Sequence, residues 1–213
     1  MDIKQKFDLY YDLLVSWNEK FNLTSVTDRE KVELLHFKDS ILASDIIPNN
    51  SAVLDIGSGA GFPAIPLKIV RNDIDVTMVD SVNKKVTFLN EVISSLKLSG
   101  IKAIHKRIED LNKEEKYDVV TSRAVAPLNV LVEYCLPFVK IGGFMIAYKS
   151  TQISEELDNA KKAIDVIGGK LEEIKQIELN EEIIRNFVII KKIKESPKGY
   201  PRGGNKPRLK PIL

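Results

Sequence analysis

The chain of 213 residues is long enough for one well-buried domain with an extension, and it is too short for two ordinary domains. No apolar stretch approaches the roughly 18 residues of a membrane span, and the charged start lacks the apolar core of a signal peptide, so we expect a cytoplasmic protein without membrane contact. Cys135 is the single cysteine and excludes an internal disulfide; with His36 and His105 it forms a poor ligand set, and we expect no metal site.

The charge is unevenly distributed. The net charge is +2, but residues 194–213 carry six basic side chains and one acidic side chain, together with four prolines. The body that remains is therefore mildly acidic. Such a basic, proline-rich tail is typical either of a solvated, disordered end or of an arm that contacts phosphate groups.

Two helices are expected at the start. Apolar residues at helical spacing predict a helix over residues 2–21. Asp28 is a good N-cap for a second helix that runs through Leu42, and Pro48-Asn49-Asn50-Ser51 interrupts the chain after it. We therefore assign residues 1–50 to an N-terminal helical extension.

Short strands and helices alternate after this extension. Apolar runs predict strands near residues 52–56, 76–79, 101–104, 117–121, 144–148, 171–179 and 183–190. Helices lie between them, the first opened by Pro63, the next capped by Ser81, and the fifth strand introduced by Gly142-Gly143. This alternation predicts an α/β fold with a mostly parallel, doubly wound, Rossmann-like sheet over residues 51–193, followed by the tail 194–213. Ligands of such sheets bind beyond the carboxyl ends of the strands.

A glycine loop follows the first strand. It reads Asp55-Ile56-Gly57-Ser58-Gly59-Ala60-Gly61-Phe62-Pro63, and glycines at alternate positions allow a sharp turn and a close approach to a ligand. A dinucleotide fingerprint would place its third glycine at the position of Phe62. The nearby carboxylate of Asp55 also offers no favourable contact to a pyrophosphate, because both groups are negatively charged. S-adenosylmethionine carries a sulfonium and an ammonium cation, so an acidic strand end suits it better.

Asp80 ends the second strand, 19 residues beyond the last glycine of the loop. An acid at this spacing accepts hydrogen bonds from the ribose hydroxyls of an adenosine. The alternative is an acid that interacts with the dipole of the helix that follows. Because the glycine loop and the acid occur together, we favour cofactor binding.

The ends of the third and fourth strands are less specific. Glu109 or Asp110 after the third strand suits an adenine amino group, and an ordinary acidic turn explains them equally well. Ser122-Arg123-Ala124-Val125-Ala126-Pro127 follows the fourth strand, where methyltransferases of this architecture hold the acceptor. Arg123 is suited to a carboxylate, a phosphate or a guanine O6. Cys135 lies in an apolar helix, which favours a buried structural thiol over a nucleophile.

At this point the residues resemble the glucose-inhibited division protein B family, the bacterial 16S ribosomal RNA guanine-N7 methyltransferases. The resemblance covers nearly the whole chain and rests on Trp17-Asn18, Asn22-Leu23-Thr24, the glycine loop, Asp80-Ser81 with Lys84-Lys85, Arg107 with Glu109, Ser122-Arg123-Ala124 and Tyr200-Pro201-Arg202. The Ser-Arg-Ala and Tyr-Pro-Arg segments are the most specific. The chain departs from the pattern at Ala64 and Ser150, where glycine is usual.

The resemblance implies a class I methyltransferase that binds S-adenosylmethionine and acts on a guanine in the decoding-region loop of the small subunit. It implies cofactor contacts at Gly57, Phe62, Ile108, Glu109 and Arg123, to which the residue pattern adds Gly59 and Asp80. The expected partner is 16S ribosomal RNA or the small ribosomal subunit, and the expected form is a monomer. The basic tail then becomes a phosphate-contacting arm, and the expected RNA contacts are Arg123, Tyr200, Arg202, Lys206 and Arg208.

Guanine N7 has an in-plane lone pair and loses no proton before it attacks a methyl carbon. We therefore assign no catalytic acid, base or nucleophile, and expect catalysis to depend on alignment, which supplies about 7–11 kcal/mol. Three alternatives stay open: a small-molecule methyltransferase of the same fold, a nicotinamide oxidoreductase, and a non-catalytic RNA-binding module.

Overall fold

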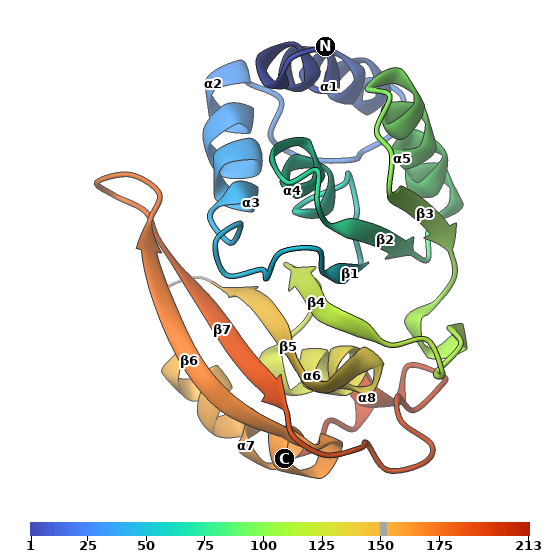
Figure 1. Ribbon diagram of the computed structural model, residues 1–213, viewed down its shortest axis with the longest axis vertical. Helices are drawn as coiled ribbons and strands as arrows, with labels where there is room; N and C mark the ends of the chain where they lie inside the picture. The colour runs from blue at the N-terminus through green and yellow to red at the C-terminus, as the bar shows by residue number, and fades with distance from the viewer. Residues whose placement is uncertain (150–152) are drawn as a thin grey trace. The chain divides into compact units, whose positions relative to one another are not determined.

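The computed structural model describes residues 1–149 and 153–213 (Figure 1). Ser150 lies outside the described residues. The chain divides into two compact units, Met1–Lys106 and Arg107–Leu213. The division into an extension, a cofactor domain and a tail stays a prediction. None of the helices in the described part of the chain combines the length and the apolarity that a bilayer crossing requires.

The first unit begins with α1 (Ile3–Asn18), which Asp2 and Gln5 start with a capping box: the Asp2 carboxylate accepts from the Gln5 amide at 2.8 Å, and the Gln5 side chain accepts from the Asp2 amide at 3.0 Å. The apolar stripe of α1 buries Tyr10 and Leu14 as the helix packs on α4 and α5. Asp28 caps the second helical run as predicted, because its carboxylate accepts from the Lys31 amide at 3.0 Å. This run consists of α2 (Arg29–Val32), the π-helical segment η1 (Glu33–Lys38) and α3 (Asp39–Ile41).

Three parallel strands in the order β3-β2-β1 form the sheet of the first unit. They are β1 (Ala52–Ile56), β2 (Asp75–Asp80) and β3 (Ile101–His105), with the helices α4 (Ala64–Val70) and α5 (Asn83–Ser95) between them. Two predicted helix starts are wrong by a residue. Pro63 is the N-cap of α4 and not its first helical residue, and Val82, not Ser81, is the N-cap of α5. In place of Ser81, the Asp80 carboxylate accepts from the Val82 amide at 2.9 Å.

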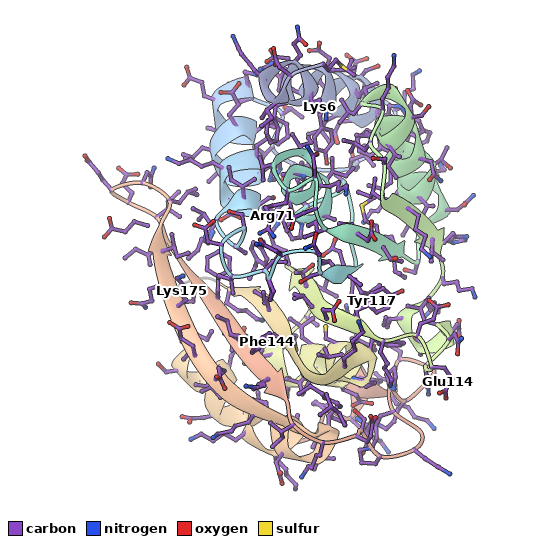
Figure 2. All side chains as sticks on the ribbon, viewed as in Figure 1. Lys6, Arg71, Glu114, Tyr117, Phe144 and Lys175 are labelled. Carbon is purple, nitrogen blue, oxygen red and sulfur yellow. The ribbon has the colours of Figure 1, made fainter. Side chains whose placement is uncertain are left out.

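The second unit has four strands in the order β4-β5-β7-β6. β4 and β5 are parallel, and β7 is antiparallel to both of its neighbours, so β6 and β7 form the long hairpin of Figure 1. Figure 2 labels Tyr117 at the start of β4 and Phe144 within β5. The elements are η2 (Ile108–Asp110), β4 (Tyr117–Arg123), α6 (Leu128–Cys135), η3 (Leu136–Phe138), β5 (Val139–Lys149), α7 (Ser154–Ile167), β6 (Gly169–Glu178), β7 (Ile184–Lys192) and α8 (Lys206–Leu209).

β5 begins earlier than the sequence predicts. Gly142-Gly143 lies inside the strand, at the register shift that separates the pair Tyr117–Val139 from the pair Val119–Phe144. A Cβ at Gly143 would lie 2.4 Å from the Asp118 carbonyl oxygen. Gly143 therefore allows a close approach of two strands, Gly142 supplies a left-handed backbone with φ +89, and the pair does not mark a strand start. Cys135 is fully buried in α6, as expected of a structural thiol.

The buried Lys192 at the end of β7 predicts a pH dependence of stability. Its side chain is 1% exposed and donates to the Ile167 carbonyl oxygen at 2.8 Å and to the Ser196 hydroxyl. Burial lowers the pKa of Lys192 from 10.5 to about 8. The unfolded chain keeps the ordinary pKa and binds more protons between these values, so stability rises with pH in this window.

Lys192→Met removes this titration. Between pH 8 and pH 10.5 the free energy of unfolding of the wild type is expected to rise relative to that of the variant, by at most about 3 kcal/mol. Urea unfolding at half-unit pH steps measures the difference. Parallel curves for the two proteins would show that Lys192 titrates in the folded state as it does in the unfolded chain.

Candidate active site

The glycine loop in the first unit is held by main-chain hydrogen bonds to the end of β2. The amides of Gly57 and Ser58 donate to the Val79 carbonyl oxygen at 2.8 and 3.2 Å, and the Gly59 amide donates to the Asp80 carboxylate at 2.9 Å. Gly59 has φ +58, and the nearest atom to a Cβ there would be 3.9 Å away. Glycine is therefore favoured at this position by its left-handed backbone and not by lack of space.

Asp80 is 6% exposed and joins two segments of the first unit. One carboxylate oxygen accepts from the Gly59 amide and the other from the Val82 amide at the start of α5, while the Lys85 ammonium lies 4.0 Å away. Each carboxylate oxygen retains a second lone pair for a further donor. Asp80 thus combines the helix-end position with a place beside the glycine loop, so the two interpretations of this residue do not exclude each other.

The aromatic residue that ends the glycine loop is part of the core. Phe62 is 6% exposed, and its ring stacks on His36 with the centroids 4.5 Å apart and contacts Tyr10 at 5.5 Å. The Tyr10 hydroxyl in turn donates to the Ala60 carbonyl oxygen at 2.5 Å, so α1 fixes the loop from its other side. Because the Phe62 ring is used in packing, a contact with the cofactor would come from its main chain.

The predicted site residues of the second unit lie on η2 and at the end of β4. Ile108 is 8% exposed, and the Glu109 side chain is 10% exposed with its carboxylate 3.8 Å from Arg107. Arg123 is the last residue of β4 and is half-buried. Burial raises the pKa of Tyr134 on α6, as does the charge of Glu109, whereas Arg208 beside it acts in the opposite direction.

The tail is ordered and packs on α6. Arg202 donates three hydrogen bonds to the Glu133 carboxylate, from its amide at 2.9 Å and its guanidinium at 2.8 and 2.6 Å. Glu133 is 1% exposed, and its carboxylate raises the pKa of Arg202. The Arg202 guanidinium therefore neutralises a buried carboxylate of its own chain, and its contact with RNA stays a prediction.

The other expected RNA contacts differ in their exposure and in whether their side chains contact other residues of the chain. The Tyr200 ring is half-buried and lies 5.8 Å from the Arg202 guanidinium. Arg208 is exposed, yet it donates to the Val125 carbonyl oxygen at 2.9 Å. Lys206 is exposed, and its ammonium makes no ion pair with any residue that the structure describes.

The family model described as "GidB: rRNA small subunit methyltransferase G" matches residues 3–187. The chain belongs to this family. A ribosomal RNA small subunit methyltransferase G from Desulforamulus reducens is 50% identical over 97% of this chain and 89% of its own length. The protein of the same name from Staphylococcus carnosus is 48% identical over 99% of this chain and 91% of its own length.

Solved methyltransferase structures share the fold of this GidB family member at low identity. TYW2 from M. jannaschii in complex with AdoMet has a TM-score of 0.61 at 18% identity, covering 78% of each chain. The ribosomal protein L11 methylase from Lactobacillus delbrueckii has a TM-score of 0.56 at 15% identity, covering 73% of this chain and 78% of its own. The Rossmann-like class I methyltransferase fold predicted from the sequence is confirmed.

The structure of the GidB family member adds, in each unit, residues that hold the predicted site segments. Tyr10 holds the glycine loop, Glu133 anchors the tail, and Lys149 donates to the Ala126 carbonyl oxygen at 3.0 Å. Each acts on a main-chain group or a side chain far away in the sequence. Only the pairing of a buried acid with an arginine was detectable in principle, because Glu133 interrupts the apolar helix that contains Cys135.

Proposed function

We propose that the chain transfers the methyl group of S-adenosylmethionine to N7 of a guanine in the decoding-region loop of 16S ribosomal RNA. The observation that carries the proposal is the family match over residues 3–187, supported by named relatives that are about half identical along nearly the whole chain. A cytoplasmic location and a monomeric state are part of the same proposal. Because guanine N7 needs no base, the protein has to bind the cofactor and the RNA, orient them toward each other and exclude water.

The residues of the glycine loop fit the cofactor. Asp55 is fully buried near the end of β1, where its negative charge suits a ligand with cationic groups, and Asp80, 6% exposed at the end of β2, suits the ribose. The open space beside Gly59 allows the ligand to approach the main chain. Gly57, Gly59, the Phe62 main chain and Asp80 would hold the cofactor, with Ile108, Glu109 and Arg123 as the proposed contacts from the second unit.

When bound, S-adenosylmethionine supplies an electrophilic methyl group on a sulfonium sulfur. The acceptor nitrogen needs an in-line approach, and holding it there contributes about 7–11 kcal/mol on general grounds. Arg123 is the residue of the second unit best suited to orient the acceptor, because a guanidinium donates to a guanine O6 or to a phosphate.

The function is tested by incubating the protein with labelled S-adenosylmethionine and small subunits from a strain that lacks this modification. Label is expected on one guanine of 16S RNA, at N7. Parallel incubations with protein-free 16S RNA decide whether the RNA alone suffices as the substrate. Label confined to small molecules or to another RNA position would overturn the proposal, and tight RNA binding without cofactor affinity would indicate a binding module.

Arg123→Ala is expected to lower turnover by at least tenfold and to leave the folded state intact, because the half-buried side chain ends a strand outside the apolar core. Single-turnover methylation at saturating RNA measures the loss, and urea unfolding measures stability. A variant that unfolds at lower urea but methylates normally when folded would make Arg123 a structural residue.

A further inference from the structure

The loop between β4 and α6 (residues 124–127, called the acceptor loop here) has an unfavourable backbone. Ala124 has φ +56, a left-handed conformation that a residue with a Cβ rarely adopts. Such a conformation costs on the order of 1 kcal/mol and persists only where neighbouring groups hold it. Pro127, at the other end of the loop, is the N-cap of α6. The acceptor loop directly follows Arg123, the last residue of β4, which pairs with Tyr148 of β5.

Two cations from different elements hold successive carbonyl groups of this loop. The Arg208 guanidinium donates to the Val125 carbonyl oxygen at 2.9 Å, and the Lys149 ammonium donates to the Ala126 carbonyl oxygen at 3.0 Å. Lys149 is 12% exposed and also pairs with Glu156 at 2.6 Å. Both carbonyl groups therefore accept hydrogen bonds from charged side chains of other elements, which helps to hold the loop that begins with the left-handed Ala124.

The position of Arg208 depends on the anchor at Arg202. The Arg202 guanidinium donates to the buried Glu133 of α6 and also to the Lys210 carbonyl oxygen at 2.9 Å. These contacts link the two ends of the segment that contains α8. Pro201 and Pro207 are both buried on either side of the exposed Gly203-Gly204. The segment 200–210 is thus attached on α6 by charge and by packing, with Arg208 presented to the acceptor loop.

We propose that Lys149 and Arg208 form a carbonyl clamp that fixes the acceptor loop, and that the ordered C-terminal segment works as a positioning element of the active site. This inference rests on the proposed function and adds to it by giving Lys149 and Arg208 a role in placing the acceptor loop. Lys149 and Arg208 are positioning residues that act through the main chain of the loop that follows Arg123.

Arg208→Met and Lys149→Met test the clamp, because methionine keeps an unbranched chain and removes the donor. Each is expected to lower the rate of methylation at saturating RNA by about tenfold, since small misplacements of reacting groups cost up to 10²-fold. Amide hydrogen exchange in residues 124–126 should rise in both variants, while exchange in the middle of α7 stays unchanged. Arg208→Lys keeps a long donor and should recover most of the rate.

A phosphate contact by Arg208 makes a different prediction. Arg208→Met would then reduce the slope of log affinity against log salt by roughly 0.7–0.9 and leave the rate at saturating RNA unchanged. Lys198→Met removes the same charge from an exposed position of the segment and serves as the control. A fall in the slope with an unchanged rate, or unchanged exchange in the acceptor loop, overturns the clamp. Wild-type protein that fails to methylate RNA overturns the proposed function instead.

Discussion

Replacing Arg202 by alanine is expected to lower the free energy of unfolding by about 3–5 kcal/mol, the usual cost of leaving a buried charge without its partner. The reason is Glu133, which is 1% exposed and accepts hydrogen bonds from the Arg202 side chain on both oxygens. Among the residues that the structure describes, the Arg202 amide alone would remain to donate to the Glu133 carboxylate, at 2.9 Å. Urea unfolding at neutral pH measures the loss as a lower midpoint with an unchanged slope.

Two further variants separate the ion pair from charge in general. Lys140→Ala removes the partner of Asp118 from a pair of 2.7 Å whose side chains are 47% and 38% exposed, and it should cost at most about 1 kcal/mol. The double variant Arg202→Met with Glu133→Leu should recover much of the loss, because an apolar pair in this place leaves no charge to solvate. An Arg202→Ala variant of wild-type stability with weaker RNA binding would show that Arg202 serves RNA binding and not the stability of the fold.

The same contact changes how the tail should be tested. Deleting residues 194–213 removes Arg202, the partner of the Glu133 carboxylate, together with the segment that packs on α6. Loss of RNA binding after such a deletion would therefore include loss of structure. Single substitutions at exposed positions such as Lys198 and Lys206 separate electrostatic contact with RNA from folding.

The sequence predicted well where one local signal decides the structure. Apolar, β-branched runs placed β1 at residues 52–56 as observed, and Asp28 was recognised as an N-cap because it lies beside the helix that it caps. The family prediction, which the match over residues 3–187 confirms, was possible because its motifs are also local. The glycine loop was recognised for the same reason, since its spacing of glycines is visible within nine residues.

The sequence did not indicate those features of the structure that residues outside the local motif decide. Arg202 and Glu133 are 69 residues apart, so nothing in the basic tail alone indicates that one of its charges is neutralised internally. Gly142-Gly143 resembles a turn, but the approach of Asp118 from a neighbouring strand makes it part of β5. Ser81 is of a residue type common at helix N-caps, but the preceding Asp80 supplies the acceptor for the Val82 amide.

Asp80→Ala is expected to weaken S-adenosylmethionine binding by at least tenfold. A carboxylate that accepts hydrogen bonds from two ribose hydroxyl groups contributes about 1.5–3 kcal/mol of binding free energy for each bond. The substitution also frees the Gly59 amide, which the carboxylate holds at 2.9 Å, so the glycine loop loses part of its support. Isothermal titration calorimetry with the cofactor measures the affinity.

Asp80→Asn distinguishes the two contributions, because its amide oxygen still accepts from one main-chain amide while the negative charge is lost. If the carboxylate binds the ribose, Asp80→Asn should also bind the cofactor weakly but unfold at a urea concentration closer to that of the wild type than Asp80→Ala does. Asp75→Ala removes a carboxylate from the other end of β2, where the residue is exposed, and is the matched control for charge. Wild-type affinity in both Asp80 variants would mean that this carboxylate serves only the amides of Gly59 and Val82, and that the cofactor is held by other residues of the loop.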